Sequence, residues 1–228
     1  MDRNAFWEMI EQSRTSSADP DARLEWLTER LAALPVTEIA DFQTHLGQVR
    51  RRVDTWWMWG AAYLICDGLC SDDGFWYFQA WLVGLGREAF ERVAANPDAL
   101  AELPEVQRLA GRGVGSWSED DWPEWESLDY VADEAYERVT GEDEGLDDAL
   151  QAQGHDGLSS PEPTDERWDF EDEQERTRRL PRLSTVFPLT ERTQRDARNR
   201  AVFDRLLAER GQTEEEFFAE ISGHPVQP

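Results

Sequence analysis

Apolar residues recur at intervals of three and four through the first 141 residues, which is the spacing of one face of a helix. The clearest run has leucine at positions 24, 27, 31 and 34, and Asp19-Pro20 opens it with an N-cap residue followed by proline. No stretch alternates with a period of two for long, and β-branched residues are scarce. The pattern predicts a compact all-α domain over residues 1–141, which is long enough to bury its own core.

Further helix signals follow one another with short gaps. Asn4, Thr37 and Ser71 each stand before an amphipathic run, where a short polar side chain can cap a helix. Trp56–Cys66 is apolar all round and predicts a buried central helix that ends near Gly68.

Charge is distributed unevenly along the 228 residues. The chain has 49 acidic residues against 23 basic ones, all of them arginine, and a formal net charge of −26. Residues 117–175 alone hold 23 acids and two arginines. Because like charges at this density repel, we interpret residues 142–180 as an acidic, largely disordered linker. Residues 181–228 predict a C-terminal helical hairpin that docks on the domain or on a second chain.

This acidity disfavours a nucleic-acid backbone or an anionic membrane as the main partner, because both would be repelled. Two cysteines cannot build a disulfide scaffold. The N-terminal region lacks the apolar segment of a signal peptide, and no apolar run approaches the ~20 residues of a membrane span. We therefore expect a soluble cytoplasmic protein.

The segment Cys70–Phe75 carries the densest candidate chemistry. Asp72 and Asp73 are adjacent carboxylates beside the hydroxyl of Ser71, and they could bind a hard cation or a polar ligand. Consecutive helical residues point about 100° apart, so both acids cannot easily chelate one ion. The favoured interpretation is that Ser71 caps a helix and the two acids complement its dipole.

Cys66, Cys70 and His45 are further candidates for a metal or nucleophile site. Zinc needs four ligands, and the other two of the three histidines lie in the linker and the tail. Cys66 lies in an apolar run and is typical of a buried thiol. A Cys70–His45 nucleophile pair stays open, although a third member is missing. Since known cofactor-binding motifs are absent, we expect neither a metal nor a cofactor.

Aromatic residues crowd between positions 56 and 81. Their number exceeds what one small core can bury, so we expect some of them to line a cleft or a helix contact. Trp117, Trp122 and Trp125 stand among acids and could pin that stretch onto the domain. The candidate ligand-binding residues are Trp59, Ser71, Asp72, Asp73, Trp81 and Arg87.

A set of short runs points to a known family. The most specific are Trp59–Leu64, Cys70–Phe75 and Gly86–Phe90, and runs near positions 6, 96 and 130 are similar as well. On these runs the chain resembles the bacterial domain-of-unknown-function family 4240 over residues 1–141. Family members often have arginine where this chain has Gln79. The resemblance implies the fold and extent of the domain and supplies no catalytic residues.

Three classes of function are compatible with these features. The leading hypothesis is a cytoplasmic binding or interaction module with an aromatic-rich site near Trp59–Trp81. One alternative is a hydrolase or metal-assisted enzyme that uses Asp72 and Asp73. The other is an acidic mimic or inhibitor that occupies a basic surface of another protein. The identity of a protein partner and the oligomeric state stay open.

Overall fold

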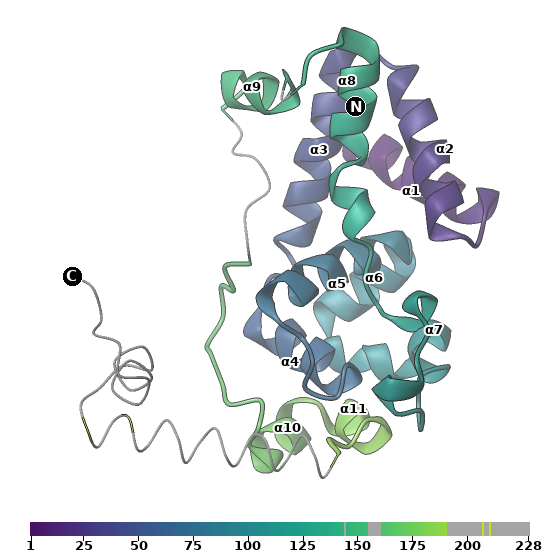
Figure 1. Cartoon of the computed structure of the whole chain (residues 1–228). Coiled ribbons are helices and arrows are strands. Elements are labelled where there is room, and N and C mark those ends of the chain that lie inside the picture. Colours follow the sequence, from purple (N-terminus) through teal and green to yellow (C-terminus); the bar gives the residue numbers. More distant parts are fainter. Residues whose placement is uncertain (144, 155–160, 191–206, 208–209, 211–228) are drawn as a thin grey trace, which may run out of the picture. The chain divides into compact units, whose positions relative to one another are not determined.

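The computed structural model describes residues 1–143, 145–154, 161–190, 207 and 210. All regular secondary structure in these residues is helical, which confirms the all-α prediction (Figure 1). The chain divides into two units, Met1–Pro188 and Leu189–Pro228. The hairpin predicted from Thr190 onward lies almost wholly outside the described residues. Within the described part, no helix is both long and apolar enough to cross a membrane.

Four helices pack together in the first unit, and Figure 1 shows α8 lying against α2 and α3. They are α1 (Arg3–Ser16), α2 (Pro20–Ala32), α3 (Val36–Arg50) and α8 (Val131–Thr140). The ring of Phe6 meets that of Phe42 at a centroid distance of 5.1 Å, which joins α1 to α3. Asp19 caps α2 as the sequence predicts, but the side chain that caps α1 is Asp2 and not Asn4. Likewise, α3 begins before Thr37 and has no side-chain cap.

A second group of helices follows α3 in the chain. They are α4 (Trp56–Ile65), α5 (Asp72–Gly84), α6 (Arg87–Ala95), the 3₁₀-helix η1 (Pro97–Glu102) and α7 (Pro104–Gln107). The bounds of α4 agree with the predicted apolar helix, and positive φ angles at Asp67 and Gly68 turn the chain after it. One side of α4 carries Trp56 and Trp59, which are only partly buried.

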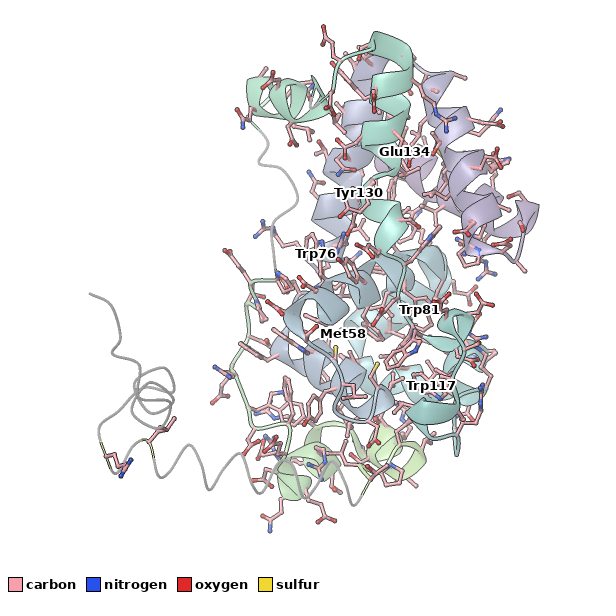
Figure 2. The ribbon with its side chains drawn as sticks, viewed as in Figure 1. Met58, Trp76, Trp81, Trp117, Tyr130 and Glu134 are labelled. Atoms are coloured by element: carbon pink, nitrogen blue, oxygen red, sulfur yellow. The ribbon has the colours of Figure 1, made fainter. Side chains whose placement is uncertain are left out.

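A buried polar cluster joins the two groups of helices. The Arg50 guanidinium forms an ion pair with Asp129, donates to the Trp76 carbonyl oxygen at 2.5 Å and lies 3.4 Å from the centroid of the Trp76 ring (Figure 2 labels Trp76). Burial raises the pKa of Asp129 to about 6 and lowers that of Arg50 to about 10, because both charges have lost water. Gln79 donates to the buried carboxylate of Asp54 at 3.1 Å. The cluster fixes the crossing of α3 and α5.

Between α7 and α8 the chain returns along α5 as three 3₁₀ turns. They are η2 (Val114–Ser116), η3 (Glu119–Asp121) and η4 (Glu126–Asp129). Asp121 closes the loop, since it accepts two hydrogen bonds from Arg112 and one from the Ser118 amide. The Trp125 amide donates to the Tyr77 carbonyl oxygen at 3.1 Å and ties this return segment to α5.

The segment interpreted from sequence as a linker over 142–180 differs in the structure. It contains α9 (Gly145–Ala152) and α10 (Glu173–Arg179), and α11 (Pro181–Val186) follows. The first compact unit therefore extends to Pro188, well past residue 141. In the described parts of this acidic segment a few large apolar side chains are buried: Leu146, Leu150, Trp168 and Leu180. Their burial offsets a charge density that by itself favours disorder.

Candidate functional site

The aromatic side of α4 forms the first of two aromatic surfaces. The rings of Trp56 and Trp59 stack at a centroid distance of 5.1 Å, and Trp59 stacks on Phe75 of α5 at 4.8 Å. The Trp59 indole N–H donates to the Cys70 carbonyl oxygen at 3.2 Å. Trp59, a predicted ligand-binding residue, is thus held between two rings and the chain before α5.

Residues 165–170 cover this side of α4. Phe170 contacts Trp56, Trp59 and Tyr63 at ring-centroid distances of 6.1, 6.5 and 5.5 Å. The indole N–H of Trp168 donates to the Trp56 carbonyl oxygen at 3.1 Å. We call the surface formed by Trp56, Trp59 and Tyr63 the covered face.

Three local features fasten the cover. Trp168 lies directly against Gly60, where a Cβ atom would collide with the indole ring. Asp165 accepts hydrogen bonds from the amides of Trp56 and Trp57, so its carboxylate caps the N-terminus of α4. Farther along, buried Asp98 accepts from the amides of residues 182 and 183 at 3.0 Å each. The chain itself therefore fills the covered face.

The predicted carboxylates lie at the start of α5. Ser71 is its N-cap, and its hydroxyl accepts from the Gly74 amide at 3.1 Å. Asp72 and Asp73 are exposed in the first turn, where they complement the helix dipole. Across the described residues, no three His, Cys, Asp or Glu side chains are grouped to hold a metal ion.

The two cysteines differ in exposure, since Cys66 is buried and Cys70 is half-buried. Burial raises the pKa of Cys66 well above its usual value and that of Cys70 to about 12, so both thiols stay protonated at neutral pH. The His45 Nε2 atom lies 3.1 Å from the Met1 carbonyl oxygen, and its ring faces Phe6. The structure therefore does not bring Cys70 and His45 into contact.

Arg87 opens α6, away from the other candidates. Its guanidinium donates to the Asn4 side-chain oxygen at 3.0 Å, and its amide donates to the Glu11 carboxylate at 2.9 Å. Gly86 has a φ of +92° and lies against that carboxylate. Arg87 thus ties α6 to α1, and it lines a shallow hollow of about 720 Å³ there.

Trp81 belongs to a larger hollow of about 1340 Å³, which we call the groove. Its walls come from the α1–α2 connection, the C-terminal part of α5, the start of α7 and residues 119–130. Its aromatic lining is Trp81, Trp122, Trp125 and Tyr130. Tyr130 is 54 % exposed, and Figure 2 labels it together with Trp81.

Close packing on α5 builds one wall of the groove. Trp125 lies against Gly84, where a Cβ atom would come within 2.6 Å of the indole ring. The Arg23 guanidinium lies 4.3 Å from the centroid of the Trp125 ring and donates to the Gly84 carbonyl oxygen at 2.9 Å. Burial lowers the pKa of Arg23 to about 10, and nearby Arg14 adds to this. Trp125 therefore pins the return segment to α5, as its position among acids suggested.

Carboxylates outnumber guanidiniums around the groove. The acids are Asp19, Asp21, Glu105, Glu119, Asp120, Glu124 and Glu126, and the basic residues are Arg14, Arg23 and Arg108. Burial raises the pKa of Glu124, and the neighbouring charge of Glu126 raises it further. The Tyr77 hydroxyl donates to Glu126 at 2.9 Å. The groove thus combines aromatic walls with excess negative charge.

Sequence reasoning named Trp81 but missed Arg23 and Tyr130 as lining residues. Arg23 lies about 60 positions before Gly84, and only the folded chain brings the two together. One local signal was available: Gly60 follows Trp59 within an apolar run and Gly84 follows Trp81 by three positions, and a glycine in a helical pattern often has a packing reason.

Comparison with known proteins gives one match. The family model described as Protein of unknown function (DUF4240) matches residues 1–138. This range contains all the described residues that line the groove and all of α4, and it ends before the segment that covers α4. No curated protein and no solved structure matches the chain.

Proposed function

This chain belongs to the DUF4240 family, and we propose that it is a binding module whose ligand occupies the groove. The observation that carries the proposal is the exposure of Tyr130, beside half-buried Trp81 and Trp122, on a hollow of about 1340 Å³. Large aromatic side chains grouped at an open concave surface are typical of binding sites. The covered face is equally aromatic, but residues 165–170 already occupy it.

The groove favours binding over catalysis. Its lining, as far as the described residues go, contains neither histidine nor cysteine, the side chains that most often act as base or nucleophile. Asp72 and Asp73, the carboxylates of the enzyme hypothesis, are exposed at a helix start whose dipole they complement. The aromatic walls and the carboxylates can instead hold a ligand by stacking and by charge.

The acidic-mimic hypothesis has less support. A mimic would present its carboxylates outward as one surface, whereas several acids of the 117–175 stretch serve the fold. Asp121 pairs with Arg112, Asp129 pairs with Arg50, and Asp165 caps α4. The excess charge of this stretch is therefore partly structural.

A thermal-shift screen tests the proposal. The full chain is screened against nucleotides, sugars, polyamines and short peptides of graded charge, together with the variants Trp81→Ala and Tyr130→Ala. Trp26→Ala is the matched control, since Trp26 is a half-buried tryptophan on α2 that does not line the groove. We expect compounds that raise the melting temperature of the parent and of Trp26→Ala, with a weaker shift in both groove variants. Stabilisers that act equally on all four proteins would contradict the proposal.

A further inference from the structure

Resting on the proposed function, we infer that the groove binds an arginine- or lysine-rich segment of a partner protein. Among the residues that the structure describes, seven carboxylates and three guanidiniums line the groove, and together they make its local charge negative. A cationic segment is the ligand whose charge complements this surface, and an anionic one would be repelled.

Two of the three arginines that line the groove pair with carboxylates outside its lining: Arg14 with Glu11 at 3.7 Å and Arg108 with Asp121 at 3.9 Å. All three guanidiniums are also anchored on the main chain. Arg14 donates to the Leu85 carbonyl oxygen at 2.6 Å, and Arg108 donates to that of Asp120 at 3.0 Å. Arg23 donates to the Gly84 carbonyl oxygen. By contrast, Glu119 and Glu124 have no ion-pair partner among the described residues of the chain. These carboxylates are available to a ligand.

The aromatic walls point to the same chemistry. A guanidinium or ammonium group gains energy over the face of a tryptophan or tyrosine ring, and arginine also stacks on it. The fold uses this geometry internally, with Arg23 over Trp125 at 4.3 Å and Arg50 over Trp76 at 3.4 Å. In the groove, Trp81, Trp122 and Tyr130 offer ring surface beside carboxylates. An incoming arginine would therefore meet both partners together.

The size of the groove favours an extended chain over a small molecule. Small-ligand pockets typically enclose about 300–1,000 Å³, and the groove exceeds that range. Glu119 and Glu124 are exposed on its walls, where their carboxylates can meet a cation. Several consecutive side chains of a peptide can occupy the volume, with basic residues meeting the carboxylates along its walls.

Fluorescence anisotropy of the full chain with labelled hexa-arginine tests the inference at about 150 mM salt, where long-range attraction is screened. Hexa-glutamate serves as the probe of opposite charge. Glu119→Gln/Glu124→Gln removes two groove carboxylates. Glu8→Gln/Glu88→Gln removes two carboxylates from the α1–α6 hollow and is matched in net charge. We expect the groove variant to weaken hexa-arginine binding by about tenfold, the control variant by less than about twofold, and hexa-glutamate not to bind.

Equal weakening by the two double variants would overturn the inference, because it would mean attraction to the net charge of the chain. Failure of the parent to bind hexa-arginine would also overturn it, as would binding of spermine without binding of hexa-arginine. None of these results removes the proposed function by itself. That proposal fails only if the screen yields no stabiliser that depends on Trp81 or Tyr130.

Discussion

The covered face and the groove are both rich in aromatic residues, yet among the described residues only the covered face is filled by another segment of the chain. On the covered face, Trp56, Trp59 and Tyr63 meet Phe170. At the groove, Tyr130 remains 54 % exposed beside Trp81. A cluster of aromatic residues therefore does not by itself separate packing from binding. The two differ in whether another described segment of the same chain packs against the aromatic cluster.

The covered face and the groove share one packing feature. A helical glycine receives a tryptophan on each of them, Trp168 at Gly60 and Trp125 at Gly84. On the covered face the incoming tryptophan arrives with Phe170, which extends the cover over neighbouring rings. At the groove, Trp125 completes one wall and leaves the hollow beside it open. Substitutions at Trp168, at Gly60 and Gly84, at Ser71 and at Glu124 test how the two surfaces differ.

The largest expected effect follows from removing the cover. Trp168 is 8 % exposed, so Trp168→Ala leaves a cavity against α4 and should lower the free energy of unfolding by about 3–5 kcal/mol. Tyr130→Ala, at the open groove, should change it by less than about 0.5 kcal/mol. Denaturant unfolding measures both. Similar losses for the two variants would mean that the groove is packed as tightly as the covered face.

Substitution of the helical glycines should have the next largest effect. Gly60→Ala and Gly84→Ala each place a methyl group against an indole ring, which should cost about 1–3 kcal/mol of unfolding free energy. Gly113→Ala is the control, because a Cβ atom there meets nothing within 4 Å and its φ is −70°. Only Gly84→Ala should also weaken hexa-arginine binding. If Gly60→Ala left the free energy of unfolding unchanged, the close contact between Trp168 and Gly60 would be contradicted.

A smaller effect is expected at the start of α5. Ser71→Ala removes the hydroxyl that caps the helix and should cost about 1 kcal/mol, and Asp72→Asn should cost less. Thermal melts with and without Mg²⁺ or Ca²⁺ separate a cap from a cation site. We expect no response of the parent to either cation. A cation-dependent rise in melting temperature that Asp72→Asn or Asp73→Asn abolishes would make these acids a binding site after all.

The smallest effect concerns the pH dependence of stability at Glu124. The pKa of Glu124 in the folded chain is raised above the usual 4.5. At a pH between these two values, the folded state therefore keeps a proton that the unfolded chain has released. The stabilising contribution is present below pH 4.5 and is lost as the pH rises through the folded value. Glu124→Gln should therefore melt slightly above the parent at pH 7 and together with it near roughly pH 4. A variant that melts below the parent at pH 7 would contradict this sign.

Local signals in the sequence were sufficient for much of the fold. Asp19-Pro20 and Ser71 cap the helices that they were expected to cap, because capping depends on residues within one turn. The choice of Asn4 over Asp2 was wrong, since both can cap and only the first helical turn decides between them. The all-α class followed from spacing alone.

The candidate site was harder to predict because it depends on contacts between distant residues. Trp59 and Trp81 look alike in sequence, and the difference between them comes from Phe170, about 90 or more positions later. The acidity of residues 142–180 hid the few side chains that anchor them, of which Trp168 is the largest. Composition averages over a segment, whereas packing depends on a few of its residues.

Fluorine NMR of the full chain labelled with 5-fluorotryptophan tests the central claim most directly. Each of the 11 tryptophans gives a signal that a Trp→Phe variant assigns. On titration with hexa-arginine, the account predicts shifts at Trp81 and Trp122 and unchanged signals at Trp56, Trp59 and Trp168. Shifts at the covered-face tryptophans with none at Trp81 or Trp122 would contradict it.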